Sequence, residues 1–244
     1  MRALLSFFTA LPVRGVSLEA AAERVYLLPL VGLITGAPGA ALILLGHAMP
    51  PGVVATLALA AVLLAAGLHH TDGVLDVGDA LMVRGTPELR RSVLKDARVG
   101  VGGIGALFIV YAPALAALVA LADDSSVRAA LALLAGEVSA RSAILLALGL
   151  GKPAEPSSSS APFVRSLRGP RRVVGASLAL LGPPLLLLPL GGFAPLAAPL
   201  SASLTALVAL RAARRAFGGI GGDIVGATGE VARTVLLVAL SGMV

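Results

Sequence analysis

Long, predominantly apolar stretches recur along this chain and set what it can fold into. Five of them reach the length of about 20 residues that a helix needs to cross the hydrocarbon core of a bilayer. They are residues 27–49, 51–68, 101–122, 127–150 and 173–190. Two shorter stretches follow, 194–210 and 234–244, the second of which would be long enough if it began near Gly226. The sequence therefore predicts an all-α, polytopic integral membrane protein with about seven transmembrane helices, and residues 1–244 form a single domain.

The composition excludes the main alternatives. Of the 244 residues, 57% are hydrophobic and 13% are charged, whereas soluble domains carry about 25% charged residues. With no cysteine, the chain cannot form disulfides or thiolate metal sites. Only eight residues are aromatic and none is tryptophan, so the stacking platforms that bind bases in nucleic acids are missing. We therefore expect a lipid bilayer as a partner and no nucleic acid.

The basic residues lie in alternate loops between the predicted spans. Seventeen of the 19 Lys and Arg residues fall in four segments on one side, and the opposite loops hold almost none. The four segments are residues 2–24, 84–98, 152–172 and 211–233. Because short basic loops stay in the cytoplasm, this division predicts a cytoplasmic N-terminus. The first twelve residues are expected to lie at the membrane interface rather than to cross it.

Three aspartates follow the second predicted span. Asp72, Asp76 and Asp79 are four and three positions apart, which places their carboxylates on one face of a helix. Like charges at that spacing repel one another unless a cation neutralises them. The natural partner is Mg²⁺ or Mn²⁺, a hard cation that takes oxygen ligands and is usually shared with substrate phosphates. The pattern predicts a metal-binding, catalytic site at the cytoplasmic edge, and the alternative is a solvated polar face outside the membrane.

Two histidines precede this cluster and a basic block follows it. His69 fits a polar role at the interface, whereas His70, two residues before Asp72, is expected to line the site. Lys95 and Arg98, in the segment Lys-Asp-Ala-Arg, would lie one helical turn apart and face the carboxylates. Carboxylates that hold a divalent ion opposite basic side chains suit diphosphate chemistry. For the neighbouring Arg90 and Arg91, the bias of cytoplasmic loops toward basic residues is an equally good explanation.

A few other ionisable residues lie within or beside the apolar stretches. Glu137 and Arg141 are four apart in one span, so they share a face and can pair. Glu23, just before the first span, either caps a helix or faces substrate. Asp223 follows a glycine-rich run, residues 218–222, and can share a helical face with Glu230. That run has no Lys-Ser or Lys-Thr pair, so it is not a Walker phosphate loop.

Four ordered motifs together resemble the cobalamin synthase family, the adenosylcobinamide-GDP ribazoletransferases. They are residues 8–12 (FTALP), 70–79 (HTDGVLDVGD), 95–100 (KDARVG) and 218–223 (GGIGGD). The run LPLVG at residues 28–32 also resembles the family's first span, so the resemblance covers essentially the whole chain. One departure is Ala80, because the family commonly has glycine after the third aspartate.

The resemblance implies a Mg²⁺-dependent enzyme of the cytoplasmic (inner) membrane, with its active site on the cytoplasmic side. Such an enzyme joins adenosylcobinamide-GDP to α-ribazole or its 5′-phosphate, giving adenosylcobalamin or its 5′-phosphate and GMP. By the same resemblance, the three aspartates are the metal-binding and catalytic carboxylates. Lys95, Asp96 and Arg98 belong to the second family block and Asp223 to the last, as substrate-binding residues. The sequence leaves the oligomeric state open, a homo-oligomer included.

Two alternatives come from other readings of the same features. A cytidine diphosphate alcohol phosphotransferase has the same reaction class, but its motif has Ala-Arg two residues after Asp-Gly, where this chain has Leu75-Asp76. An ion-coupled transporter could use a carboxylate ion site. Against it, the charges gather at the membrane edge and no internal repeat supports alternating access.

Overall fold

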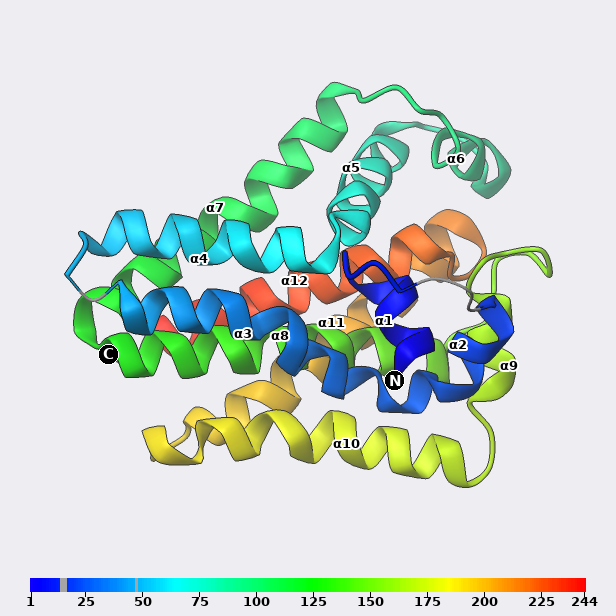
Figure 1. The fold of residues 1–244 in the computed structure, drawn as a ribbon. Helices are drawn as coiled ribbons and strands as arrows, with labels where there is room; N and C mark the ends of the chain where they lie inside the picture. Colours follow the sequence, from blue (N-terminus) through cyan, green and yellow to red (C-terminus); the bar gives the residue numbers. More distant parts are fainter. Residues whose placement is uncertain (14–16, 47) are drawn as a thin grey trace.

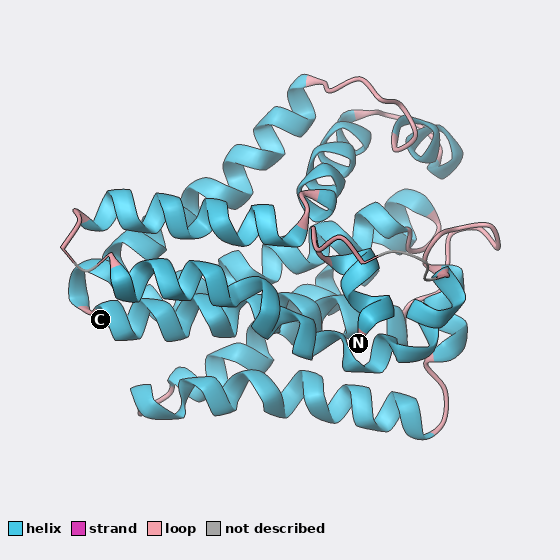
Figure 2. Cartoon of the chain, viewed as in Figure 1, coloured by secondary structure: helices cyan, strands magenta, loops and turns pink. Residues whose placement is uncertain are grey.

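The computed structural model describes residues 1–13, 17–46 and 48–244, and within these ranges the chain is almost entirely helical (Figures 1 and 2). The described part contains no strand, only an isolated bridge between Pro153 and Ile220. The all-α prediction is confirmed. The helices are α1 (Arg2–Phe8), α2 (Leu18–Arg24), α3 (Leu28–Leu45), α4 (Pro51–Ala66), α5 (His69–Met82), α6 (Pro87–Val93), α7 (Val101–Asp124), α8 (Ser126–Leu150), α9 (Ala161–Ser166), α10 (Pro170–Leu187), α11 (Ala194–Phe217) and α12 (Gly222–Ser241).

Six helical segments of the described chain are long and apolar enough to cross a membrane, or seven if a bent pair is counted as one span. This agrees with the predicted number of about seven. The six are Leu18–Leu45, in which α2 and α3 are joined by a 3₁₀ turn, then α7, α8, Pro170–Leu190, α11 and α12. The bent pair is α4 and α5, which meet at an angle of 93°.

The sharp bend between α4 and α5 occurs at Gly67 and Leu68. Both residues have left-handed backbone angles, with φ of 80° and 61°, and Leu68 is the one non-glycine residue in the described ranges with positive φ. The predicted span 51–68 therefore ends at Ala66, and α5, which carries the three aspartates, turns sharply away from the axis of α4 (Figure 1). Helix α5 has only 14 residues, too few to cross a bilayer, and it is not one of the six segments that are long enough to do so.

The last two helices differ from their predicted bounds. Helix α11 continues to Phe217, and α12 begins at Gly222 rather than near Gly226 or at Thr234. This places Arg233 inside α12 with no exposed surface, so its assignment to the cytoplasmic loop after the sixth span was wrong. The charged residues at 223, 230 and 233 lower the hydropathy of this segment, which hid the first half of the helix.

Helix α8 forms the centre of the bundle, with α3, α10, α11 and α12 packed around it (Figure 1). Its approach to α3 is close at Gly32, where an added Cβ would lie 2.6 Å from the Val138 Cα. Small residues at such contacts let helix backbones pack tightly inside a membrane. The short helices α1, α2, α6 and α9 gather at one end of the bundle, and the C-terminus lies at the other (Figure 1).

Candidate active site

Helix α5 is held between α7 and α12 by close backbone contacts. At Gly73, an added Cβ would lie 2.6 Å from the backbone oxygen of Asp223, and at Gly78 it would lie 2.7 Å from that of Gly102. Only glycine leaves room for these approaches. The first contact brings Asp223, at the start of α12, against the turn of α5 that carries Asp72.

Asp72, Asp76, Asp79 and Asp223 form one acidic group. Partial burial, together with the negative charges of Asp72, Asp223 and Asp79 in that order, raises the pKa of Asp76 to about 6. Since a carboxylate responds this way to nearby negative charge, α5 and α12 concentrate negative charge that a cation would relieve. Sequence spacing placed the first three aspartates on one face, and the fold adds Asp223 to them.

Asp79 has a structural role in addition to any part in catalysis. Its carboxylate accepts hydrogen bonds from the backbone N–H groups of Gly100, at 2.7 Å, and Gly103, at 2.8 Å. Gly100 is the N-cap residue of α7 and Gly103 lies in its first turn, where backbone N–H groups have no partner within the helix. The carboxylate therefore caps α7 and compensates its positive N-terminal end. An added Cβ at Gly100 would lie 2.5 Å from Oδ1 of Asp79, which explains the glycine there.

The residues of this group fit a magnesium ion that is shared with substrate. In the described ranges, no three His, Asp or Glu side chains already converge on one point as the ligands of a metal would. Mg²⁺ does not need such a cage, because it commonly binds through one or two carboxylates, water and substrate phosphates. The metal ligands that Asp72, Asp76 and Asp223 offer are all carboxylate oxygens, the kind of ligand that this ion prefers.

The basic block 95–98 lies beyond the end of α6 and is not helical, so Lys95 and Arg98 are not one helical turn apart as predicted. The Arg98 guanidinium pairs with Asp96 at 2.7 Å and lowers the pKa of that carboxyl to about 2. Lys95 Nζ lies 3.6 Å from a Glu155 carboxylate oxygen. Within the described residues, no hydrogen bond or ion pair joins these basic side chains to the three aspartates. Glu23 lies on the exposed side of α2 and has no such contact with the aspartates either.

A polar pocket connects the basic block with the acidic group. It has a volume of about 180 Å³ and is lined by Lys95, Glu155, the serine loop at residues 157–159, and Asp223. Arg91 holds its walls together, because Nη1 donates to the Phe217 carbonyl at 2.7 Å while Nε donates to Glu155 at 3.1 Å. Nothing in the sequence favoured a site role for Arg91 over the bias of cytoplasmic loops toward basic residues.

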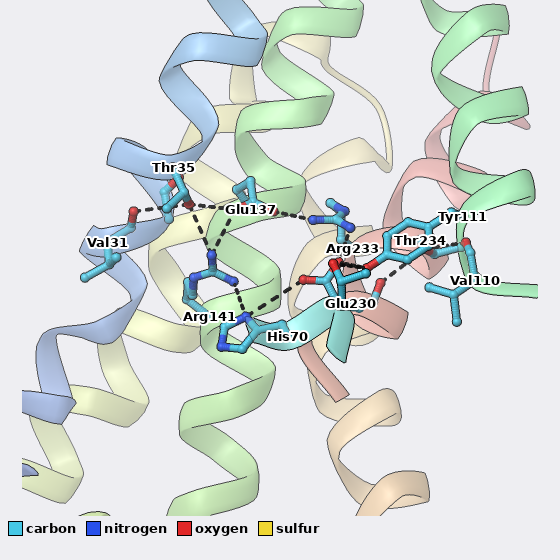
Figure 3. A network of polar contacts seen from close by, with 12 residues as sticks. Val31, Thr35, His70, Val110, Tyr111, Glu137, Arg141, Glu230, Arg233 and Thr234 are labelled. Atoms are coloured by element: carbon cyan, nitrogen blue, oxygen red, sulfur yellow. Dashed lines mark hydrogen bonds and ion pairs between the residues drawn. The ribbon is translucent and has the colours of Figure 1, made fainter. Parts of the chain in front are cut away.

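A network of buried charges lies next to His70, in the first turn of α5 (Figure 3). Glu137 and Arg141 pair at 3.3 Å, which confirms the pairing expected from their spacing. Arg233 donates to Glu137 at 2.8 Å and also pairs with Glu230. Glu137 further accepts a hydrogen bond of 2.6 Å from Thr35. Two arginines and two glutamates, all essentially without exposed surface, therefore balance one another inside the bundle.

This network fixes the first turn of α5. Arg141 Nη1 lies 3.1 Å from Nδ1 of His70 (Figure 3). The hydroxyl of Tyr111 bonds Glu230 at 2.9 Å and Thr71 at 2.9 Å. His70 and Thr71 directly precede Asp72, so the buried ion pairs set where the acidic face begins. The pairing of Glu230 with Arg233 could have been predicted from their spacing of three residues. Nothing in the sequence indicated the role of Tyr111.

Comparison with known proteins agrees with these motifs. The model of the family described as cobalamin-5-phosphate synthase matches residues 1–241. The chain belongs to this family. The resemblance recognised from the four motifs is thereby confirmed, and the family match includes the α5 aspartates, the basic block and the glycine-rich start of α12.

Several relatives carry the name adenosylcobinamide-GDP ribazoletransferase. That of Halorubrum lacusprofundi is 36% identical over 97% of this chain and 94% of its own. That of Pyrobaculum islandicum is 47% identical over 48% of each chain. That of Saccharolobus solfataricus is 40% identical over 49% of this chain and 48% of its own. The last two matches thus span about half the length of those relatives. No solved structure matches the chain.

Proposed function

We propose that this protein joins adenosylcobinamide-GDP to α-ribazole, or to α-ribazole 5′-phosphate, and releases GMP. The observation that carries the proposal is the acidic group of α5 and α12 beside a polar pocket with a basic rim, in a chain of the cobalamin-5-phosphate synthase family. The relatives' names supply the substrates.

The reaction is a displacement at phosphorus. The ribose hydroxyl oxygen of α-ribazole forms a bond to the phosphorus that carries cobinamide, and the bridging bond from that phosphorus to the GMP oxygen breaks. The hydroxyl proton passes to a carboxylate of the acidic group, which acts as general base. The corrinoid phosphate is thereby transferred to the nucleoside, and GMP leaves with the electrons of the broken bond.

We propose that Asp72, Asp76 and Asp79, together with Asp223, hold Mg²⁺ in the working enzyme. The bound ion would neutralise charge on the diphosphate and on the departing GMP. The repulsion that Asp76 experiences from its neighbours supports this assignment. Lys95 lines the polar pocket together with Asp223, and in this proposal it binds the outer phosphate oxygens.

We further propose that the protein is a multi-pass protein of the cell membrane with this site on the cytoplasmic side. The basic segments and the acidic group lie toward the same end of the bundle (Figure 1), and basic loops favour the cytoplasm. A reporter fused after Arg172 should read cytoplasmic, and one fused at Asp124 should read external. A cytoplasmic signal at Asp124 would overturn the orientation.

The reaction is tested with purified protein in detergent and the two substrates. GMP should appear only when protein, adenosylcobinamide-GDP, α-ribazole and Mg²⁺ are all present, in step with the corrinoid product. GMP release that does not depend on α-ribazole would mean hydrolysis instead of transfer. No GMP from folded protein in the complete mixture, with α-ribazole or its 5′-phosphate as acceptor, would refute the proposed function.

A further inference from the structure

A second pocket lies beside the polar one and differs from it in chemistry. It has a volume of about 370 Å³ and is lined by residues of α1, α8 and α9 and of the first turns of α5 and α12. Its walls are mainly apolar, with Ile144, Leu148 and Val225 among them. Pockets of this size, apolar but with a few polar groups, are typical of sites for small organic ligands.

Aromatic rings gather at this pocket in a chain that has very few. Phe7, Phe8 and Phe163 line it, three of the six phenylalanines in the sequence. The rings of Phe8 and Phe163 meet edge to face with centroids 5.8 Å apart, and the ring of Phe8 lies 6.2 Å from that of His70. Such rings offer stacking surface to another planar aromatic group.

His70 supplies one hydrogen-bond donor to these apolar walls. Its Nδ1 lies 3.1 Å from Arg141 Nη1, and a guanidinium can only donate. Nδ1 must therefore accept, which places the ring proton of neutral His70 on Nε2. The side chain lines the pocket, and its second ring nitrogen points away from the buried network (Figure 3), so a ligand in the pocket can accept a hydrogen bond from this N–H.

The two pockets adjoin. Both are lined by Ser159 and Gly222, and Gly222 directly precedes Asp223. On α5, His70 of the apolar pocket is two residues from Asp72 of the acidic group. A ligand with a ring in the apolar pocket and a hydroxyl group at the shared boundary would present that hydroxyl to the carboxylates.

We propose that the apolar pocket binds the base of the acceptor nucleoside, an inference that rests on the function proposed above. α-Ribazole is an aromatic benzimidazole on a ribose, and that base has a single ring nitrogen free to accept a hydrogen bond. One donor, the Nε2–H of His70, matches that single acceptor. The guanine of the donor substrate is the competing occupant, but its edge carries several polar groups, and among the described residues the only polar side chains that line this pocket are those of His70, Ser159 and Ser160.

Inhibition of the unaltered protein separates the two occupants. Benzimidazole alone should inhibit GMP release competitively with α-ribazole and not with adenosylcobinamide-GDP. Competition with adenosylcobinamide-GDP instead would assign the pocket to guanine or corrinoid and overturn the proposal.

Matched phenylalanine variants locate the effect. Phe8→Leu, which keeps the apolar character but removes the ring, should raise the KM for α-ribazole by about tenfold, in line with the loss of one stacking partner. Phe8→Tyr should stay close to the unaltered protein, and the KM for adenosylcobinamide-GDP should change by less than about twofold in either variant. Phe108→Leu is the control, because Phe108 is 74% exposed on α7 and does not line the pocket.

The outcomes distinguish this proposal from the proposed function. If the unaltered protein releases GMP but Phe8→Leu leaves the KM for α-ribazole unchanged, the pocket assignment is wrong and the function stands. If the unaltered protein releases no GMP, the function fails. Equilibrium dialysis of radiolabelled benzimidazole then tests whether the apolar pocket binds the base. Equal binding by Phe8→Leu and Phe108→Leu would refute that assignment.

Discussion

Replacing Glu137 by glutamine should destabilise the protein strongly, because it removes one charge from a balanced buried network. Glu137 contacts Arg141 at 3.3 Å and Arg233 at 2.8 Å, and none of the three has exposed surface. In Glu137→Gln, two buried arginines share one remaining carboxylate, that of Glu230. Breaking a buried ion pair by removing one partner costs about 3–5 kcal/mol. At about 2–4 °C per kcal/mol for a chain of this size, the melting temperature should fall by about 6–20 °C.

The assay is thermal unfolding of purified protein in detergent, followed by far-ultraviolet circular dichroism. Asp124→Asn is the matched control, because Asp124 and Arg128 form another pair four residues apart, at 2.8 Å, in which both side chains are partly exposed. A pair of that kind contributes about 0–1 kcal/mol, so the control should move the melting temperature by no more than about 4 °C.

A double variant tests whether charge imbalance is the cause. Glu137→Gln combined with Arg141→Gln leaves one arginine with one glutamate, so its loss of stability should be smaller than the sum of the two single losses. Additive losses would show that the charges act separately. A melting temperature for Glu137→Gln within about 2 °C of the unaltered protein would refute the view that this carboxylate balances the arginines.

Three further results are expected. Gly103→Ala should lower activity and stability together, since an added Cβ would lie 2.8 Å from the carboxylate oxygen that caps α7; thermal unfolding and GMP release measured on one preparation would show this, and full activity would contradict it. Lys95→Gln should weaken the binding of adenosylcobinamide-GDP by about tenfold, because one charge-assisted contact is lost, whereas Arg172→Gln should not. If the two variants have equal KM values for adenosylcobinamide-GDP, Lys95 does not bind the phosphates. In EDTA at pH 8, Asp76→Asn should have a higher melting temperature than the unaltered protein, and this difference in melting temperature should shrink toward pH 5. The sign follows because a raised pKa of about 6 means that the folded state binds the proton more tightly, so the unaltered protein loses stability as pH rises through that value; a difference that grows toward pH 5 would contradict it.

The sequence was enough to predict the membrane bundle and the helix that carries the aspartates. Apolar run length decides whether a segment can cross a bilayer, and it identified all the crossing helices except the first half of α12. That half was missed because Glu230 and Arg233 lower its hydropathy, although each finds an opposite charge inside the protein. Pairing of this kind depends on the tertiary fold and is invisible to a hydropathy pattern.

The site was predictable in its residue types but not in its geometry. Helical spacing placed Asp72, Asp76 and Asp79 on one face, but the contact that adds Asp223 joins residues about 150 positions apart, at Gly73. Asp79 as a cap for α7 likewise depends on how two helices meet. The helical turn predicted for Lys95 and Arg98 was wrong, because α6 ends at Val93 and Arg98 folds back on Asp96.

The proposed reaction depends on a divalent cation bound by the acidic group, and electron paramagnetic resonance of Mn²⁺ measures that binding. Mn²⁺ takes the same oxygen ligands as Mg²⁺, and the free ion gives a signal that binding diminishes. Titration into the purified protein with adenosylcobinamide-GDP should show binding for the unaltered chain and for Asp124→Asn, whose aspartate lies at the opposite end of the bundle. Binding should be lost in Asp76→Asn. Equal binding by Asp76→Asn and the unaltered protein would contradict a metal site at these carboxylates.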